Sequence, residues 1–158
     1  MNQTTHDPFE EYTAVIQSLT TVAKDIARVE QIKTAAATEK KHELLDDCIQ
    51  EEQAHLLKLR GLEQRRMKLQ DALGWNSFTL HQILDAALPE QQEALTPLFG
   101  KLERQLEQLQ QAREASEQII KVRLHELEIF TRQGASYDNA GNISHTGASQ
   151  ARIRSKYV

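Results

Sequence analysis

Two Glu-x-x-His patterns are the residues of this sequence whose spacing could support metal chemistry: Glu39 with His42, and Glu52 with His55. In di-iron helical bundles this spacing directs two ligands inward, but such sites need the motif on two facing helices plus further glutamates. Both patterns here lie in or near one helical segment. We therefore interpret them as solvated polar residues and predict no metal and no cofactor. A helical-bundle metalloprotein that uses Glu52 and His55 is a rival interpretation.

Other catalytic arrangements find little support. Cys48 falls on an apolar stripe between Leu45 and Ile49, which is typical of a small core residue rather than a reactive thiol. The sequence has no glycine-rich phosphate loop, and its six histidines are scattered singly. These features predict that the protein is not an enzyme.

A basic run in the same segment could in principle bind nucleic acid or a membrane surface. At helical spacing its side chains spread around a polar face, which favours solvation or pairing within the chain. The whole chain has 19 Lys and Arg against 23 Asp and Glu, a net charge of −4, which argues against a nucleic-acid binder. The run consists of Lys58, Arg60, Arg65, Arg66 and Lys68, opposed by Glu63.

Composition predicts that helices position all of these residues. Leucine, glutamine, alanine and glutamate dominate, aromatic residues make up 5%, and only three prolines and six glycines interrupt the 158 residues. A mean hydropathy of −0.58 and the lack of a long apolar run exclude insertion into a membrane. The single cysteine and the absence of a secretory signal lead us to expect a cytoplasmic protein.

Apolar spacing and capping signals divide the chain into four helices. The first spans about residues 8–36 and begins with Asp7 and Pro8. The second has an unmarked start, for which Thr34 or Thr38 could be the cap. Its leucine stripe runs to Gly74.

The other two helices follow a corner at residues 75–77. A short helix begins with the capping box of Thr79 and Gln82 and stops before Pro89. The last long helix begins at Pro89 or at Pro97 and ends near residue 132. Gly61, inside the second helix, suggests close packing or mild bending there.

The predicted fold is therefore all-α: an elongated antiparallel helical hairpin or bundle of three long helices and one short helix. Residues 1–132 form this domain. Residues 133–158 hold three of the six glycines and lack apolar periodicity, so we predict a flexible C-terminal tail.

The end of the last helix is the predicted partner-binding element. A stretch of small and polar residues follows Leu109, and an apolar cluster resumes beyond it, long enough to accept an amphipathic helix. Two apolar residues of the tail could fold over the bound segment. The alternative is that the cluster closes the end of the protein's own bundle. The predicted binding residues are Ile119, Ile120, Leu124, Leu127, Phe130, Tyr137 and Ile143.

With these features in place, the sequence resembles the FlgN-type flagellar export chaperones over about residues 10–141. The resemblance rests on the leucine-rich helix that ends at Gly74, the Thr79-Leu80 helix start, a proline near 89 and the long last helix. The sequence from Ser136 to Gly141 resembles the tyrosine-containing ending of some members. Where family members often carry paired asparagines, residues 113–118 of this chain have none.

The resemblance implies a cytoplasmic chaperone without catalytic activity. Its partners would be the hook–filament junction proteins (FlgK-like and FlgL-like), whose helical terminal segments it holds and delivers to components of the type III export apparatus. The family binds its substrate through the C-terminal region, and homo-oligomers are possible. A coiled-coil scaffold or assembly protein without an export role would have the same fold and is the main alternative.

Overall fold

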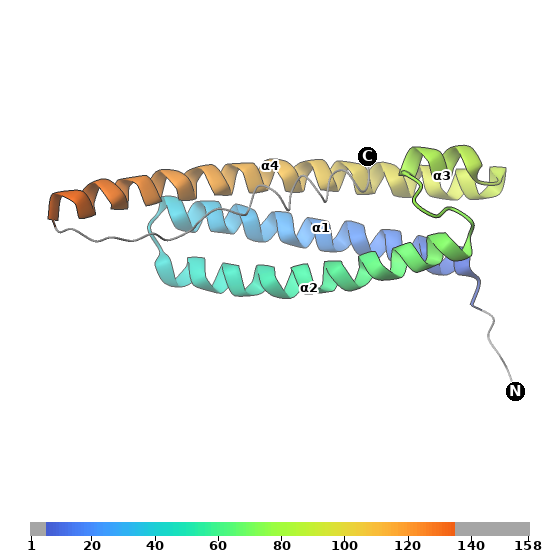
Figure 1. Ribbon diagram of the computed structural model, residues 1–158, viewed down its shortest axis with the longest axis horizontal. Helices are drawn as coiled ribbons and strands as arrows, with labels where there is room; N and C mark the ends of the chain where they lie inside the picture. The colour runs from blue at the N-terminus through green and yellow to red at the C-terminus, as the bar shows by residue number, and fades with distance from the viewer. Residues whose placement is uncertain (1–5, 135–158) are drawn as a thin grey trace, which may run out of the picture.

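The computed structural model describes residues 6–134, with side chains as far as Arg132. It contains α1 (Pro8–Thr38), α2 (His42–Ala72), α3 (Leu80–Ala86) and α4 (Pro89–Gly134), and no strand among these residues. The prediction of three long helices and one short helix is confirmed. In Figure 1, α1 lies between α2 and α4. The chain runs along α2 in the direction opposite to α1, and along α4 in the same direction as α1.

The two strongest predicted helix starts form as expected. The backbone N–H of Phe9 donates to Asp7 Oδ1 at 3.0 Å, and Pro8 occupies the first turn of α1. At α3 both halves of the capping box are present: Gln82 N–H donates to Thr79 Oγ1, and Thr79 N–H donates to Gln82 Oε1. These signals succeed because they depend only on residues close in the sequence.

The connection between α1 and α2 differs from the prediction. Thr38 does not cap α2: it belongs to α1, and its hydroxyl donates to the Thr34 carbonyl at 2.8 Å. The chain reverses sharply at Lys40, whose φ of 59° is in the left-handed region, and Lys41 precedes α2 without a side-chain cap. A threonine hydroxyl inside a helix can bond to the carbonyl four residues back, so its presence alone does not mark a start.

The corner after α2 is fixed by buried polar contacts. Gly74 adopts the predicted left-handed conformation, with φ of 79°, just after the helix ends. Gln70, which is buried, donates to the carbonyls of Trp75 and Phe78 at 3.2 and 3.5 Å. The hydroxyl of Tyr12 donates to Gln70 Oε1 at 3.3 Å, so this corner is tied to the start of α1.

The structure shows where α4 begins and what surrounds Gly61 inside α2. α4 begins at Pro89 and continues through Pro97 as one helix to Gly134, two residues beyond the predicted end. Around Gly61 there is open space where a side chain would project, so the predicted close packing is absent. The predicted tail beyond Gly134 lies outside the described residues.

The tightest core lies at the end of the molecule where α1 begins and α3 packs on α4; we call it the closed end (Figure 1). The ring of Tyr12 meets those of Trp75 and Phe99 edge to face, with centroids 5.7 and 6.4 Å apart. Leu80 and Ile83 of α3 complete this core and are almost fully buried.

In the half of the molecule that contains the α1–α2 connection, as along the whole length of the helices, α1 packs against both α2 and α4, whereas α2 and α4 have little contact with each other. Leu44, Ile49 and Leu57 of α2 are all exposed there. We call this half, which contains the α1–α2 connection, the open end. α3 packs against α4 at the closed end, and no short helix of the described chain covers the open end.

Candidate functional site

The last part of α4 extends past the rest of the bundle at the open end (Figure 1). Arg123 marks the point where contact with α1 ends: its guanidinium donates to the carbonyls of Ala37 at 3.1 Å and Thr38 at 2.8 Å. These carbonyls belong to the last turn of α1, where the helix dipole favours a cation. Residues 124–134 therefore overhang α1 by roughly 16 Å, at 1.5 Å per residue.

A hollow of about 430 Å³ lies under the overhang, and we call it the end hollow. Its floor is formed by Ala36 and Ala37 of α1, which are buried but fill little volume. Leu45 of α2 lines one side. Its α4 wall consists of Ile120, Arg123, Leu124, Glu126, Leu127 and Phe130.

A second hollow of about 610 Å³, the side groove, lies between α2 and α4 and extends toward the middle of the bundle. Ile49 and Leu56 line it from α2, and Ile120 and Leu124 line it from α4. Since Ile120 and Leu124 line both hollows, the two form one continuous surface along the inner side of α4.

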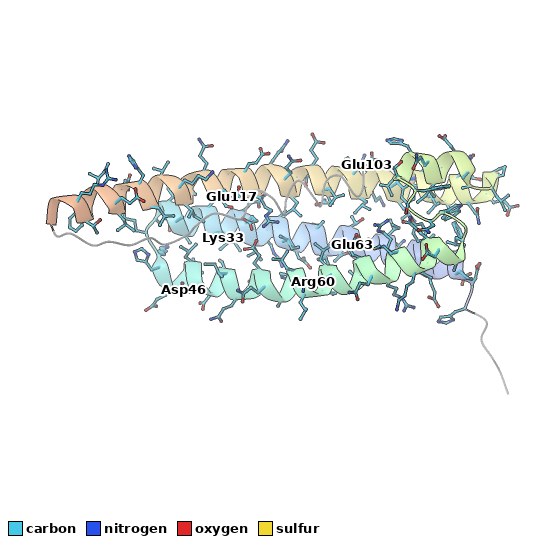
Figure 2. All side chains as sticks on the ribbon, viewed as in Figure 1. Lys33, Asp46, Arg60, Glu63, Glu103 and Glu117 are labelled. Carbon is cyan, nitrogen blue, oxygen red and sulfur yellow. The ribbon has the colours of Figure 1, made fainter. Side chains whose placement is uncertain are left out.

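The predicted binding residues within the described chain fall largely on this surface. Leu127 and Phe130 are 54% and 75% exposed, although both are apolar, and Ile120 and Leu124 are half-buried. Ile119 is half-buried but is not among the residues that form the two hollows. Tyr137 and Ile143 lie outside the described residues. The exposed orange end of α4 carries side chains with no helix beside them in Figure 2.

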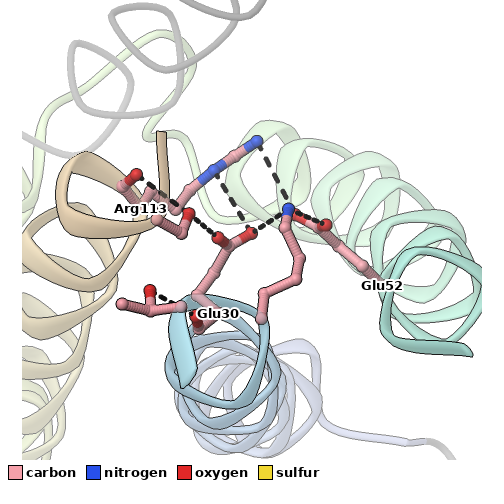
Figure 3. A network of polar contacts seen from close by, with 6 residues as sticks. Glu30, Glu52 and Arg113 are labelled. Carbon is pink, nitrogen blue, oxygen red and sulfur yellow. Dashed lines mark hydrogen bonds and ion pairs between the residues drawn. The ribbon is translucent and has the colours of Figure 1, made fainter. Parts of the chain in front are cut away.

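A cluster of charged side chains forms the inner end of the side groove, and sequence reasoning missed it (Figure 3). Lys33 of α1 bridges two glutamates: its Nζ is 3.3 Å from Glu30 Oε1 and 2.8 Å from Glu52 Oε2. Arg113 of α4 lies 3.9 Å from both of these glutamates. The buried hydroxyl of Ser116 donates to Glu30.

This cluster corrects the interpretation of Glu52 as a solvated residue, because only 7% of it is exposed, and Glu30 is 1% exposed. The signal for Glu30 was present in the sequence: it follows Ile26 by four residues, on the buried stripe of α1. The gap of small residues in α4 is explained in part too, since Ser116 contacts Glu30 of the cluster and Ala112 is buried in the hydrophobic core.

Burial and hydrogen bonding shift the pKa values of Glu30 and Glu52 in opposite directions. Desolvation, together with a hydrogen bond to Glu52, raises the pKa of Glu30 to about 7. Burial also opposes ionisation of Glu52, but hydrogen bonds from Glu30 and Lys33 and the charge of Arg113 lower the pKa of Glu52. A proton held between them therefore resides on Glu30, and Glu52 carries the negative charge that faces both cations.

The same contacts bear on the metal alternative. The carboxylate of Glu52 forms an ion pair with Lys33, whereas His55 Nε2 lies 3.5 Å from Glu51 Oε1. The two side chains of the motif therefore have different partners and do not converge on one metal position. Among the described residues, no three His, Cys, Asp or Glu side chains are grouped as a metal site would require. A lysine ammonium in the middle of the cluster supplies the positive charge that a cation would otherwise bring.

Two arginines of the basic run, and the cysteine, have structural roles. Arg66 is buried and donates to Glu63, and Arg65 reaches Glu11 of α1 at 2.7 Å, so these two arginines pair within the chain. Cys48 is 3% exposed, as expected for a core residue, and burial raises the pKa of its thiol.

No described helix has an apolar stretch long enough to cross a lipid bilayer. Comparison of the chain with protein-family models, with curated proteins and with solved structures finds no match.

Proposed function

We propose that this protein is a helix-binding chaperone that receives an amphipathic helix of a client protein along the inner side of α4. The observation that carries the proposal is the surface formed by the end hollow and the side groove, which exposes Leu127 and Phe130 beside half-buried Ile120 and Leu124. A monomeric soluble protein rarely leaves such a continuous apolar surface without a use for it.

The shape of the surface favours a helix as its occupant. At the open end α2 and α4 both pack on α1, and the side groove separates them. A fourth helix in this groove would complete a four-helix bundle. Apolar side chains at positions 120, 124 and 127 recur at the spacing that receives an amphipathic helix.

The charged cluster gives the proposed site a means of discriminating between clients. Lys33 and Arg113 line the inner end of the groove, and a helix seated there would bury them further. Because burying a charge beside an apolar group is costly, a client with a small or polar residue at this level binds better than one with leucine.

Together with the resemblance of the sequence, these features support a more specific proposal. The clients are the helical terminal segments of hook–filament junction proteins, which the chaperone holds in the cytoplasm and delivers to the type III export apparatus. Segments that form coiled coils after assembly expose apolar faces beforehand, and a temporary helical partner covers them.

Binding of a junction-protein terminal segment to structure-guided variants tests the proposal. Leu127→Asp and Phe130→Asp are each expected to weaken binding at least tenfold, roughly 1.4 kcal/mol or more, because each places a charge on the apolar surface. Neither should change the free energy of unfolding by more than about 0.5 kcal/mol, since both side chains are exposed. Isothermal titration calorimetry and urea denaturation give the two quantities.

Leu57→Asp is the matched control, because Leu57 is 69% exposed on α2 and lines neither hollow. It should bind as the unmodified protein does. If all three variants bind the junction segments equally well, the surface is not the client site. A coiled-coil scaffold without an export role would bind none of these segments.

A further inference from the structure

The apolar surface of α4 has a spacing that suits pairing with another copy of the same helix. Ile120, Leu124 and Leu127 are four and three residues apart, which is the alternation of a coiled-coil seam. Leu127 is more than half exposed in the single chain, so the seam is incomplete without a partner.

Two side chains of opposite charge flank this seam. Lys121 and Glu128 are both exposed at the rim of the side groove, seven residues apart on the same side of α4. Within the described chain neither forms an ion pair. In a parallel pair of α4 helices Lys121 of one copy and Glu128 of the other would be a heptad apart and could not pair, whereas an antiparallel pair brings Lys121 of each copy opposite Glu128 of the other.

We propose that two copies of this chain associate through the open ends of their α4 helices, antiparallel and about a two-fold axis. Leu124 of each copy packs against Leu127 of the other at the axis, and Lys121 pairs with Glu128 on both sides of it. A two-fold axis makes every contact occur twice, so one favourable charge pair becomes two.

The lengths of the elements agree with this register. Residues 124–134 of one copy, the overhang, lie along residues 117–127 of the other, where the side groove is open. Phe130 of the second copy then comes level with Ile120 and with Ile49 of α2, both of which line that groove. The remainder of each bundle extends away from the axis in opposite directions, so the two bodies do not overlap.

The pairing is expected to be weak. An overlap of about three helical turns buries less surface than the roughly 1,600 Å² of a standard stable interface. The proposal does not depend on the proposed chaperone function, because its occupant is a second copy of this chain. It uses the same surface, so client and second copy would exclude each other.

Sedimentation equilibrium of the full chain over a concentration series tests the pairing. The unmodified protein should show a monomer–dimer equilibrium. Lys121→Glu and Glu128→Lys alone each replace two attractive pairs with two repulsive ones and should each raise the dimer dissociation constant about tenfold. An equimolar mixture of the two variants, and the double variant K121E/E128K, restore opposite charges across the axis and should recover dimerisation.

Lys101→Glu, a charge reversal at an exposed position of α4 outside both hollows, serves as the matched control and should dimerise like the unmodified protein. Circular dichroism confirms that each variant remains helical. The proposal is overturned if the unmodified protein stays monomeric at the highest protein concentration of the sedimentation series. It is equally overturned if the single variants dimerise undiminished, or if the double variant and the mixture fail to recover.

Discussion

At the scale of single residues, Glu30 and Glu52 are two buried glutamates whose pKa values are shifted in opposite directions. Both face Lys33 in the middle of the bundle. Sequence reasoning could find Glu30 on a buried stripe, but not its partners, because these come from α2 and α4. Which side chains meet there depends on the register of three helices, and no local pattern specifies that register.

The raised pKa of Glu30 has a consequence for stability. Since the folded pKa of about 7 exceeds the ordinary 4.5, the folded state holds this proton more tightly than the unfolded chain. The stabilisation is complete below pH 4.5 and is lost as the pH rises to about 7. We expect the unfolding free energy to fall by roughly 1–3 kcal/mol over this window, and Glu30→Gln, which cannot ionise, to flatten the decline. Urea denaturation across the window measures both.

Glu52→Gln distinguishes this effect from a general loss of polar contacts. The pKa of Glu52 is lowered, so its charged form is the stabilising one, and its removal leaves Lys33 and Arg113 without their main counter-charge. This variant should be less stable than the unmodified protein at pH 7. A Glu30→Gln variant with the same pH slope as the unmodified protein would contradict the assignment of the proton to Glu30.

At the scale of helices, the long last helix combines what could and could not be predicted. The start at Pro89 and the continuous path through Pro97 were open from sequence, because proline suits a helix start yet disfavours a helix interior. Pro97 is exposed, so no neighbouring side chain packs over it to account for its position. The overhang beyond Arg123 was visible only as an apolar cluster after a polar gap, since its exposure depends on where α1 ends.

Pro97 provides a test of helix energetics. Proline at this position removes the N–H that would bond to the carbonyl of Glu93 and costs up to about 3 kcal/mol relative to alanine. We expect Pro97→Ala to raise the unfolding free energy by roughly 1–3 kcal/mol without altering client binding, because the substitution lies near α3 and far from the open end. Thermal and urea denaturation measure the gain, and an unchanged or lowered stability would show that Pro97 is accommodated at no cost.

At the scale of the whole molecule, the all-α architecture followed from composition and apolar spacing, whereas the difference between the two ends did not. The closed end is filled by Tyr12, Trp75 and Phe99, and the open end has Ala36 and Ala37 where larger residues would close it. Of these residues, Trp75 lies in the predicted corner at residues 75–77, and Ala36 and Ala37 lie at the predicted end of the first helix. Only the packed volume, which depends on how side chains from several helices meet, reveals that one end is complete and the other is not.

This difference gives the protein an internal optical reference. Trp75, its single tryptophan, is 5% exposed at the closed end and contacts Tyr12 there, at the opposite end of the bundle from Phe130. Occupation of the open end should therefore leave the tryptophan emission spectrum unchanged, while global unfolding shifts it to longer wavelength as the indole meets water. Fluorescence recorded during a client titration checks this. A spectral shift on binding would mean that the two ends communicate, and that the bundle transmits a structural change along its whole length.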